Sequence, residues 1–449
     1  MTALPRILLL AAALTLSGAG TARALAIETV TSPGGITAWL VEDHALPVVS
    51  VELGFRGGSA SDPSGKAGLA EFTTDLLDEG AGPYDATQFK GRLEDLAATL
   101  AIGVDPDMAQ LDLRTLAANL PDALDLVRLA LAEPRFSDDA VARVRGQLLA
   151  ALERRARDPN YIADRLWWET EMVGHPYARP RQGTPATIAR IGPDDMRGFV
   201  RARFARDIML VGVVGDITPA QLAPLLDRAF GGLPAKAAPS GVPSAHPRDT
   251  ADLLLATMPI PQSVVVFGQP GITRDDPDWY AALLVTHILG GGGGLTSRLA
   301  LEVREKRGLA YSVYCGLAPL QHGGVIVGGV ATENARLAQS IDLIRAEWRR
   351  MRDQGPTANE LAAAKTYLTG SFPLNFDSTA RVASLLVVIQ RDQLGADYLD
   401  RRNALINAVT LDQARRVAKK ILDPGALVFA VVGSPANLKG ARSVGLEVD

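Results

Sequence analysis

Residues 68–77 read GLAEFTTDLL, and their spacing is that of an amphipathic helix. At about 100° per residue, apolar side chains gather on one side of such a helix and polar side chains on the other. The apolar side comprises Leu69, Phe72, Thr73 and Leu76, and the opposite side comprises Glu71, Thr74, Asp75 and Asp78. The pattern therefore predicts a helix near residues 67–79 with one buried side.

The residues that lead into this helix carry a resemblance. The stretch 54–59 (GFRGGS), the pair Asp62-Pro63 and the stretch 68–70 are similar to the pitrilysin and mitochondrial-processing-peptidase family. In that family the helix continues as an inverted zinc motif, H-x-x-E-H, in which two histidines bind zinc and the glutamate polarises the attacking water. Here the three positions are Glu71, Thr74 and Asp75, so the motif is degenerate.

The resemblance also implies a third zinc ligand, a glutamate on a later helix that ends shortly before an Asp-Pro pair. Counting back from Asp158-Pro159 places this ligand at Ala151. Glu153 stands two positions further on, about 200° around the helix. The five histidines include no pair at ligand spacing: they are His44, His175, His246, His287 and His322. The resemblance thus implies no zinc and no other cofactor in this chain.

Glu71 and Asp75 stand four residues apart and offer two carboxylates to a calcium or magnesium ion. Such ions take more oxygen ligands than two side chains supply. A solvated acidic helix side is the commoner outcome of this pattern. We therefore predict that neither residue is a metal ligand.

The chain repeats itself at about half its length. Ile188 to Gly215 and Ile406 to Gly433 are both separations of 27 residues, and each unit reads as a helix followed by an apolar strand that ends in glycine. The stretch 51–58, before Asp62-Pro63, likewise has a counterpart in 264–271, before Asp276-Pro277. An internal repeat of this length predicts a duplicated domain.

Residues 234–249 contain four prolines and little else that could pack, which predicts an extended linker. We expect a signal peptide at 1–26, an N-terminal peptidase-like domain at 27–233, the linker at 234–249 and a C-terminal peptidase-like domain at 250–449. In the first domain we expect strands near 28–33, 36–42 and 48–56, and helices near 67–79, 87–99, 121–132 and 137–157. The resemblance implies an α+β fold: two homologous domains, each a mostly antiparallel sheet with packed helices, facing each other across a cleft.

The second half contains five consecutive glycines, Gly290, Gly291, Gly292, Gly293 and Gly294. A phosphate-binding loop would continue with Gly-Lys-Ser or Gly-Lys-Thr, and this one does not. Glycine has no side chain and many allowed dihedral angles, so the segment can let an extended peptide approach the backbone closely. We include these glycines among the predicted substrate-binding residues; a simple turn between helices is the alternative.

In the family that this chain resembles, an arginine and a tyrosine seven residues apart reach from the second domain to the zinc site of the first. Arg304 and Tyr311 match that pair in spacing and context. A guanidinium and a phenol can both donate hydrogen bonds to a peptide carbonyl or to the oxyanion formed from it. The resemblance implies a catalytic and substrate-binding role for both, against the alternative of a surface arginine and a core tyrosine. We interpret their neighbours Arg307 and Tyr314 as surface charge and packing.

The first residues have the form of a secretory signal peptide. Arg6 precedes the short apolar run 7–16, and residues 22–26 (ARALA) offer cleavage sites after Ala24 or Ala26. The run is too short to span a bilayer, so we expect no membrane anchor after cleavage and a periplasmic location in a Gram-negative cell. Loss of residues 1–26 takes the net charge from -4 to -6, which gives no indication of nucleic-acid binding. A single cysteine, Cys315, forms no internal disulfide.

In the family that this chain resembles, metal-bearing and metal-free subunits occur together as heterodimers, and an arginine and a tyrosine without zinc ligands match the metal-free half of such a site. We therefore predict the metal-free subunit of a heterodimeric zinc-dependent oligopeptidase, inactive alone, whose homologous partner carries H-x-x-E-H and the zinc. Substrates would be peptides bound as an added strand at a sheet edge. The alternative is a non-catalytic scaffold or peptide-binding subunit with no part in proteolysis.

Overall fold

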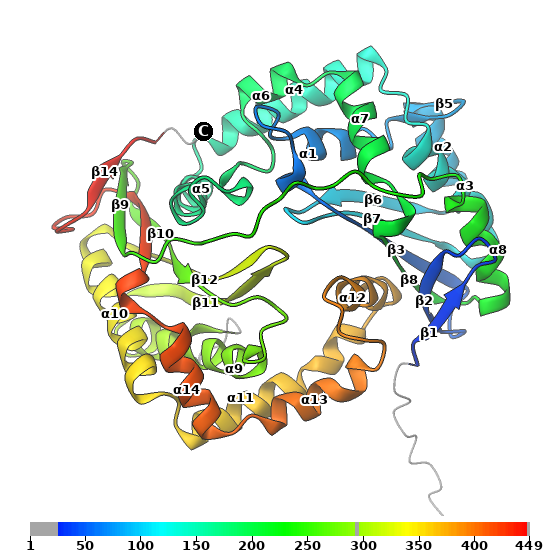
Figure 1. Ribbon diagram of the computed structural model, residues 1–449. Helices are drawn as coiled ribbons and strands as arrows, with labels where there is room; N and C mark the ends of the chain where they lie inside the picture. Colours follow the sequence, from blue (N-terminus) through cyan, green and yellow to red (C-terminus); the bar gives the residue numbers. More distant parts are fainter. Residues whose placement is uncertain (1–25, 292–295, 447–449) are drawn as a thin grey trace, which may run out of the picture.

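The computed structural model describes residues 26–291 and 296–446 of the chain, which form two sheets with helices packed around them (Figure 1). The predicted signal peptide lies almost wholly outside the described residues, as do Gly292, Gly293 and Gly294.

The first sheet has six strands in the order β1-β2-β8-β3-β7-β6. Its strands are β1 (Glu28–Thr31), β2 (Thr37–Glu42), β3 (Val48–Arg56), β6 (Thr99–Val104), β7 (Met108–Leu116) and β8 (Met209–Gly215). All neighbours are antiparallel except β2 and β8. The three early strands form near the residue ranges predicted for them, and β6 lies at one edge of the sheet. A separate small hairpin pairs β4 (Gly80–Ala81) with β5 (Tyr84–Asp85).

The second sheet repeats this arrangement with the order β14-β9-β13-β10-β12-β11. Its strands are β9 (Asp252–Thr257), β10 (Gln262–Pro270), β11 (Ala310–Leu320), β12 (Gly323–Glu333), β13 (Val428–Gly433) and β14 (Arg442–Val444). The pairs of β9 with β13 and with β14 are parallel, and the others are antiparallel. The predicted α+β class with two homologous domains is confirmed, and β11 is the edge that corresponds to β6.

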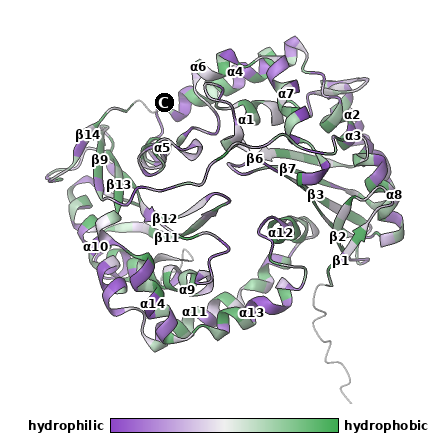
Figure 2. Cartoon of the chain, in the orientation of Figure 1, coloured by the Kyte–Doolittle hydropathy of each residue, from purple (hydrophilic) through white to green (hydrophobic). Residues whose placement is uncertain are grey.

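Helices pack on both sheets. In the first half they are α1 (Leu69–Thr74), α2 (Ala86–Asp95), α3 (Leu120–Ala132), α4 (Asp138–Arg155), α5 (Pro159–Glu171), α6 (Pro185–Arg190), α7 (Pro193–Arg203) and α8 (Pro219–Phe230). In the second half they are α9 (Trp279–Gly290), α10 (Leu337–Gln354), α11 (Ala358–Gly370), α12 (Thr379–Arg391), α13 (Tyr398–Ala408) and α14 (Leu411–Ile421). The outer helices carry their hydrophilic residues away from the sheets, as α10 and α14 show in Figure 2.

One helix from each half of the sequence packs on the sheet of the other half. Helix α5 belongs to the first half by sequence, but its Ile162 and Trp167 pack with Ala430 and Val432 of the second sheet. Helix α12 belongs to the second half and packs on the first sheet, where the Gln390 amide donates to the Val211 carbonyl at 3.0 Å. Each sheet therefore receives the helix on its second face from the other half of the chain (Figure 1).

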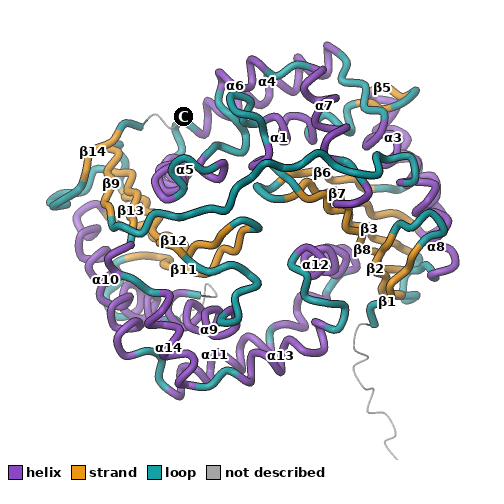
Figure 3. The backbone as a smooth tube through the Cα atoms, in the orientation of Figure 1, coloured by secondary structure: helices purple, strands orange, loops and turns teal. Residues whose placement is uncertain are grey.

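The predicted linker crosses between the two sheets without helix or strand (Figure 3). Contrary to the expectation that little in it could pack, Ala245 is buried and its N–H donates to the His322 carbonyl at 2.6 Å. Earlier in the segment, the Arg203 guanidinium donates to the Ala238 carbonyl. Its backbone groups find partners in both halves, so this segment is part of the packed structure.

Within the described residues, no single helix is long and apolar enough to cross a membrane. A bent pair, residues 358–376 with 379–391, passes the same test only when its two parts are taken together.

A carboxyl pair lies on the first sheet where α12 covers it. Glu52 on β3 faces Asp112 on β7 directly across the two strands, and Glu52 is only 2% exposed. Burial, followed by the hydrogen bond and the charge of Asp112, raises the pKa of Glu52 to about 10. Glu52 is therefore protonated in the folded protein at neutral pH.

Replacing Glu52 by glutamine is expected to stabilise the protein increasingly as pH rises from 5 to 9. Above the unfolded pKa of about 4.3, the unfolded wild type releases a proton that the folded state keeps until about pH 10. The wild type should therefore lose up to about 1.4 kcal/mol of stability per pH unit relative to Glu52→Gln. Urea unfolding at three pH values measures this difference. Parallel pH profiles would contradict it, and Glu153→Gln, at a side chain that is 72% exposed, is the control.

Candidate functional site

The start of α1 is fixed by backbone geometry. Gly68 adopts φ +93°, and a Cβ there would lie 2.7 Å from the Gln182 carbonyl oxygen, so only glycine fits. The carboxylate of Asp62, buried at 4% exposure, accepts the N–H groups of Gly68 and Ala70 at 2.9 and 3.0 Å. These bonds explain why the Asp62-Pro63 pair and the Gly68 stretch stand together in the sequence. The helix itself is shorter than predicted, because regular bonding stops at Thr74 and turns follow.

The four degenerate metal positions do lie close together. Thr74, Asp75 and Ala151 line a hollow of about 490 Å³ between α1 and α4. Glu71 and Asp75 line an adjoining hollow of about 360 Å³ along the edge strand β6. Glu153 points away, since its carboxylate pairs with Arg157 at 2.9 Å on the exposed side of α4.

The side chains at these positions do not form a metal site. Glu71 pairs with Arg181 at 3.3 Å, so a guanidinium supplies the positive charge that its carboxylate meets. The Thr74 hydroxyl donates back to the Ala70 carbonyl at 3.0 Å, and Thr74 is buried rather than solvated as its place on the polar side suggested. Partial burial and the charges of Glu71 and Asp78 raise the pKa of Asp75 to about 6. Within the described residues no three His, Cys, Asp or Glu side chains are grouped as metal ligands.

Arg304 and Tyr311 come together in the second half. Arg304 stands on a short π-helical turn, Ala300–Glu305, and its guanidinium carbon lies 5.0 Å from the centroid of the Tyr311 ring. A register shift in β11 between Ala310 and Val313 interrupts pairing with β12 at this point. Bulges of this kind re-aim a side chain, and Tyr311 is 86% exposed. The alternative of a tyrosine packed in the core is therefore wrong.

Gly290 and Gly291, the two of the five consecutive glycines that the structure describes, are closely packed against their neighbours. Gly290 ends α9 and is buried, and a Cβ there would lie 2.6 Å from the Cys315 sulfur. Gly290 and Arg304 line the same cavity of about 450 Å³ beside the edge strand β11. Gly291 is equally confined, because a Cβ would lie 2.5 Å from the His287 Cα. Close approach to neighbouring backbone, rather than freedom of movement, explains glycine at these two positions.

The two neighbours of the Arg304–Tyr311 pair differ in outcome. Arg307 is exposed and donates to the Glu302 carboxylate at 2.6 Å, as expected of surface charge. Tyr314 was interpreted as packing, but it is 54% exposed, and its ring lies over Gly329 of the neighbouring strand β12.

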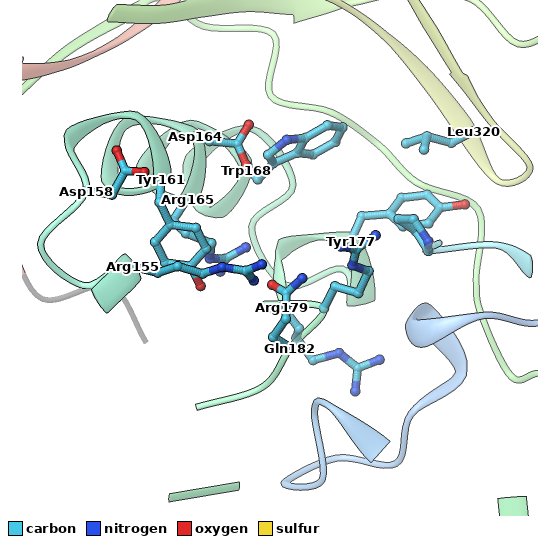
Figure 4. A pocket seen from close by; sticks show the side chains of 12 residues that line it. Arg155, Asp158, Tyr161, Asp164, Arg165, Trp168, Tyr177, Arg179, Gln182 and Leu320 are labelled. Carbon is cyan, nitrogen blue, oxygen red and sulfur yellow. The ribbon is translucent and has the colours of Figure 1, made fainter. Parts of the chain in front are cut away.

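A further cavity, of about 470 Å³, lies between α5 and the segment 177–182 and was not predicted from the sequence (Figure 4). Four arginines from three separate places in the sequence line it: Arg155, Arg165, and the nearby Arg179 and Arg181. None of these arginines stands in a recognised sequence motif. They come together only through the tertiary packing of their segments.

Relatives of known sequence carry peptidase and non-peptidase names. The non-peptidase homolog YmxG of Helicobacter pylori is 29% identical over 74% of this chain and 77% of the relative. An uncharacterized zinc protease of Streptomyces coelicolor is 26% identical over 88% of this chain and 87% of the relative. The mitochondrial-processing peptidase subunit beta of Lentinula edodes is 21% identical over 92% of this chain and 91% of the relative.

Solved structures share the fold along nearly the whole chain. A peptidase M16 inactive domain from Pseudomonas fluorescens has a TM-score of 0.85 and 28% identity, covering 94% of this chain and all of that one. A protease from Helicobacter pylori has a TM-score of 0.83 and 20% identity, covering 90% and 99%.

Two models of one family match successive parts of the chain. The model of the insulinase family, peptidase family M16, matches residues 38–184, and that of the peptidase M16 inactive domain matches residues 190–368. The resemblance seen in the sequence is thereby confirmed. The chain belongs to the M16 peptidase family, and it carries Glu71, Thr74, Asp75 and Ala151 at the positions of the family's three zinc ligands and its catalytic glutamate.

Proposed function

We propose that this chain is the non-metal-binding subunit of a heterodimeric zinc-dependent oligopeptidase, to which it contributes Arg304, Tyr311 and half of a substrate chamber. The observation that carries the proposal is the Arg304–Tyr311 pair. Its two side chains lie 5.0 Å apart, and the tyrosine is 86% exposed.

Arg304 and Tyr311 both carry hydrogen-bond donors. Among the described residues, no side chain accepts a hydrogen bond from either of them. Among the described residues, the one carboxylate that pairs with Arg304 is that of its neighbour Glu305, at 3.4 Å, a distance that marks a weak contact. The guanidinium and the phenol are therefore available to a group that arrives from outside the chain. Such donors stabilise the negative oxygen that forms when a zinc-bound water attacks a peptide carbonyl.

Each sheet ends in an edge strand, β6 in the first half and β11 in the second, that pairs with a single neighbour among the described strands. A peptide can add to such an edge through main-chain hydrogen bonds, with its side chains in pockets on either side. The hollow along β6 and the cavity beside β11 supply such pockets. These features support a peptide as the substrate, and the partner would supply H-x-x-E-H and the zinc.

A partner of the same family fits the missing half of the site. One relative, from Lentinula edodes, is named as a subunit of a mitochondrial-processing peptidase, so at least one similar protein works as part of an assembly. In this proposal the protein is exported to the periplasm and meets its partner there.

The test is a reconstitution. Three samples are purified: this chain alone, an exported relative that carries H-x-x-E-H alone, and the two chains together. Zinc content and cleavage of a quenched fluorescent peptide are measured for each sample. We expect no zinc and no cleavage for this chain alone, and cleavage that requires both chains. A relative that is equally active without this chain would overturn the proposal in favour of a scaffold.

A further inference from the structure

The cavity of Figure 4 has the size and composition of a ligand site. Its volume of about 470 Å³ lies in the usual range for small-ligand pockets. Helix α5 and the end of α4 form one wall, and segment 177–182 forms another. Pro106, from the turn between β6 and β7, and Leu320, from the end of β11, complete it, so both halves of the chain contribute.

The lining carries more positive than negative charge. Four arginines face two aspartates, although the whole chain has a net charge of -4. Both aspartates are engaged: Asp158 accepts the Asn160 N–H at 2.9 Å, and Asp164 accepts a hydrogen bond from the Trp168 indole. The cavity therefore gathers guanidinium groups in a chain whose net charge is negative.

The four guanidinium groups are not equivalent. Arg165 pairs with Glu169 at 2.5 Å, and Arg181 pairs with Glu71 at 3.3 Å. Arg179 donates to the carbonyls of Ala60 and Asp62 at 2.7 Å each, which fixes its position.

Arg155 is the exception. Its guanidinium carbon lies 5.9 Å from the centroid of the Tyr161 ring, and no carboxylate in the described part of the chain lies within ion-pair distance of it. Figure 4 shows Arg155 and Gln182 directing their polar ends into the same space. Arg155 is thus a half-buried cation without an anionic partner, placed over an aromatic ring.

We propose that this cavity binds a carboxylate group of a peptide, with Arg155 as its main donor and the Tyr161 and Trp168 rings as the apolar surface beside it. The proposal rests on the proposed function only in taking a peptide as the ligand. Arginine presents two parallel N–H donors to a carboxylate, and the aromatic rings can cover the adjoining aliphatic part of the ligand.

The cavity adjoins the strand edge at which a peptide would add. Arg181 lines both this cavity and the hollow along β6, and it donates to the carbonyl of Val104, the last residue of β6, at 3.0 Å. Pro106, two residues further on, lines the cavity itself. A peptide on β6 would therefore lead into the cavity at the Val104 end.

The direction of the peptide decides which carboxylate arrives. A peptide parallel to β6 would bring its C-terminal end to Val104, and hence its terminal carboxylate. An antiparallel peptide would bring its N-terminal part, and the carboxylate would be that of an aspartate or glutamate side chain. Both sources share the same chemistry, and a set of matched peptides separates them.

The experiment measures binding of three fluorescent peptides of one apolar sequence to the full chain by anisotropy. One peptide has a free C-terminal carboxylate, the second is its C-terminal amide, and the third is the amide with one aspartate near its N-terminus. We expect one of the two carboxylate peptides to bind about tenfold more tightly than the plain amide. Arg155→Gln should abolish that difference. The control is Arg157→Gln, two residues away, 79% exposed and paired with Glu153, which should preserve it.

Equal affinity of the wild type for all three peptides would overturn the proposal. So would an equal loss in the Arg155 and Arg157 variants, because the effect would then reflect general surface charge. The assay needs neither zinc nor cleavage nor the partner. A failed reconstitution of peptidase activity would therefore leave this result standing, and absent carboxylate discrimination would leave the reconstitution standing.

Discussion

Replacing Arg304 by alanine is expected to lower the kcat of the reconstituted heterodimer by about 100-fold to 1,000-fold, the usual effect of removing one donor to a developing oxyanion. Arg304 lies beside the exposed Tyr311 ring and lines the cavity next to the free strand β11. Removal of its guanidinium leaves the fold intact, because its side chain forms no described bond to the core. Steady-state cleavage of the quenched peptide measures the loss.

Tyr311→Phe tests the phenol separately. The ring and its contact with Arg304 remain, and only the hydroxyl donor is lost, so kcat should fall by about 100-fold with little change in KM. Arg307→Ala is the control: its guanidinium is exposed on the same segment and pairs with Glu302. If Arg304→Ala and Arg307→Ala reduce cleavage alike, or neither Arg304 nor Tyr311 matters, the pair is structural and the scaffold interpretation replaces the catalytic one.

Trp167→Ala is expected to destabilise the whole chain by about 3–5 kcal/mol, the range for deleting a buried tryptophan. Trp167 stands on α5 and is fully buried against the second sheet. Its ring packs so closely on Gly268 of β10 that a Cβ added there would lie only 2.6 Å from it. The substitution leaves a cavity at the contact through which α5 covers the other half. Because both sheets depend on an exchanged helix, we expect the two halves to lose stability together.

Chemical denaturation followed by two probes, one in each half, measures this effect. A single transition at lower denaturant concentration is the expected result. Two separated transitions, with only the second half weakened, would show that the halves unfold independently. Val173→Ala, just beyond α5 and 76% exposed, should change the midpoint little.

Much of the fold follows from local pattern. The strand at 48–56 lies where the apolar alternation predicts it, and the repeated units ending at Gly215 and Gly433 become β8 and β13 at equivalent places in the two sheets. The exchange of α5 and α12 was not predictable in this way. An amphipathic helix shows that it has a buried side, but its sequence does not tell which sheet covers that side.

The candidate site shows the same division. The resemblance to the family implied that Arg304 and Tyr311 act together, and the two side chains do lie in contact, although their catalytic role stays a prediction. Tyr311 is exposed at the place where the pairing of β11 with β12 is irregular. The spacing of residues in the sequence does not predict such an irregularity. The basic cavity was missed because Arg155 and Arg179 come from separate segments and meet only through tertiary packing.

The reciprocal helices have a consequence for cutting the chain. Helix α5 precedes residues 234–249 and α12 follows them, so a nick in that segment would produce two polypeptides that each carry the cover for the other's sheet. Fragment complementation should follow: co-expressed halves reassemble, while either half alone leaves an apolar sheet face in water and aggregates. The duplicated halves thus form one obligate folding unit, which gene fission can divide only if both products are made together.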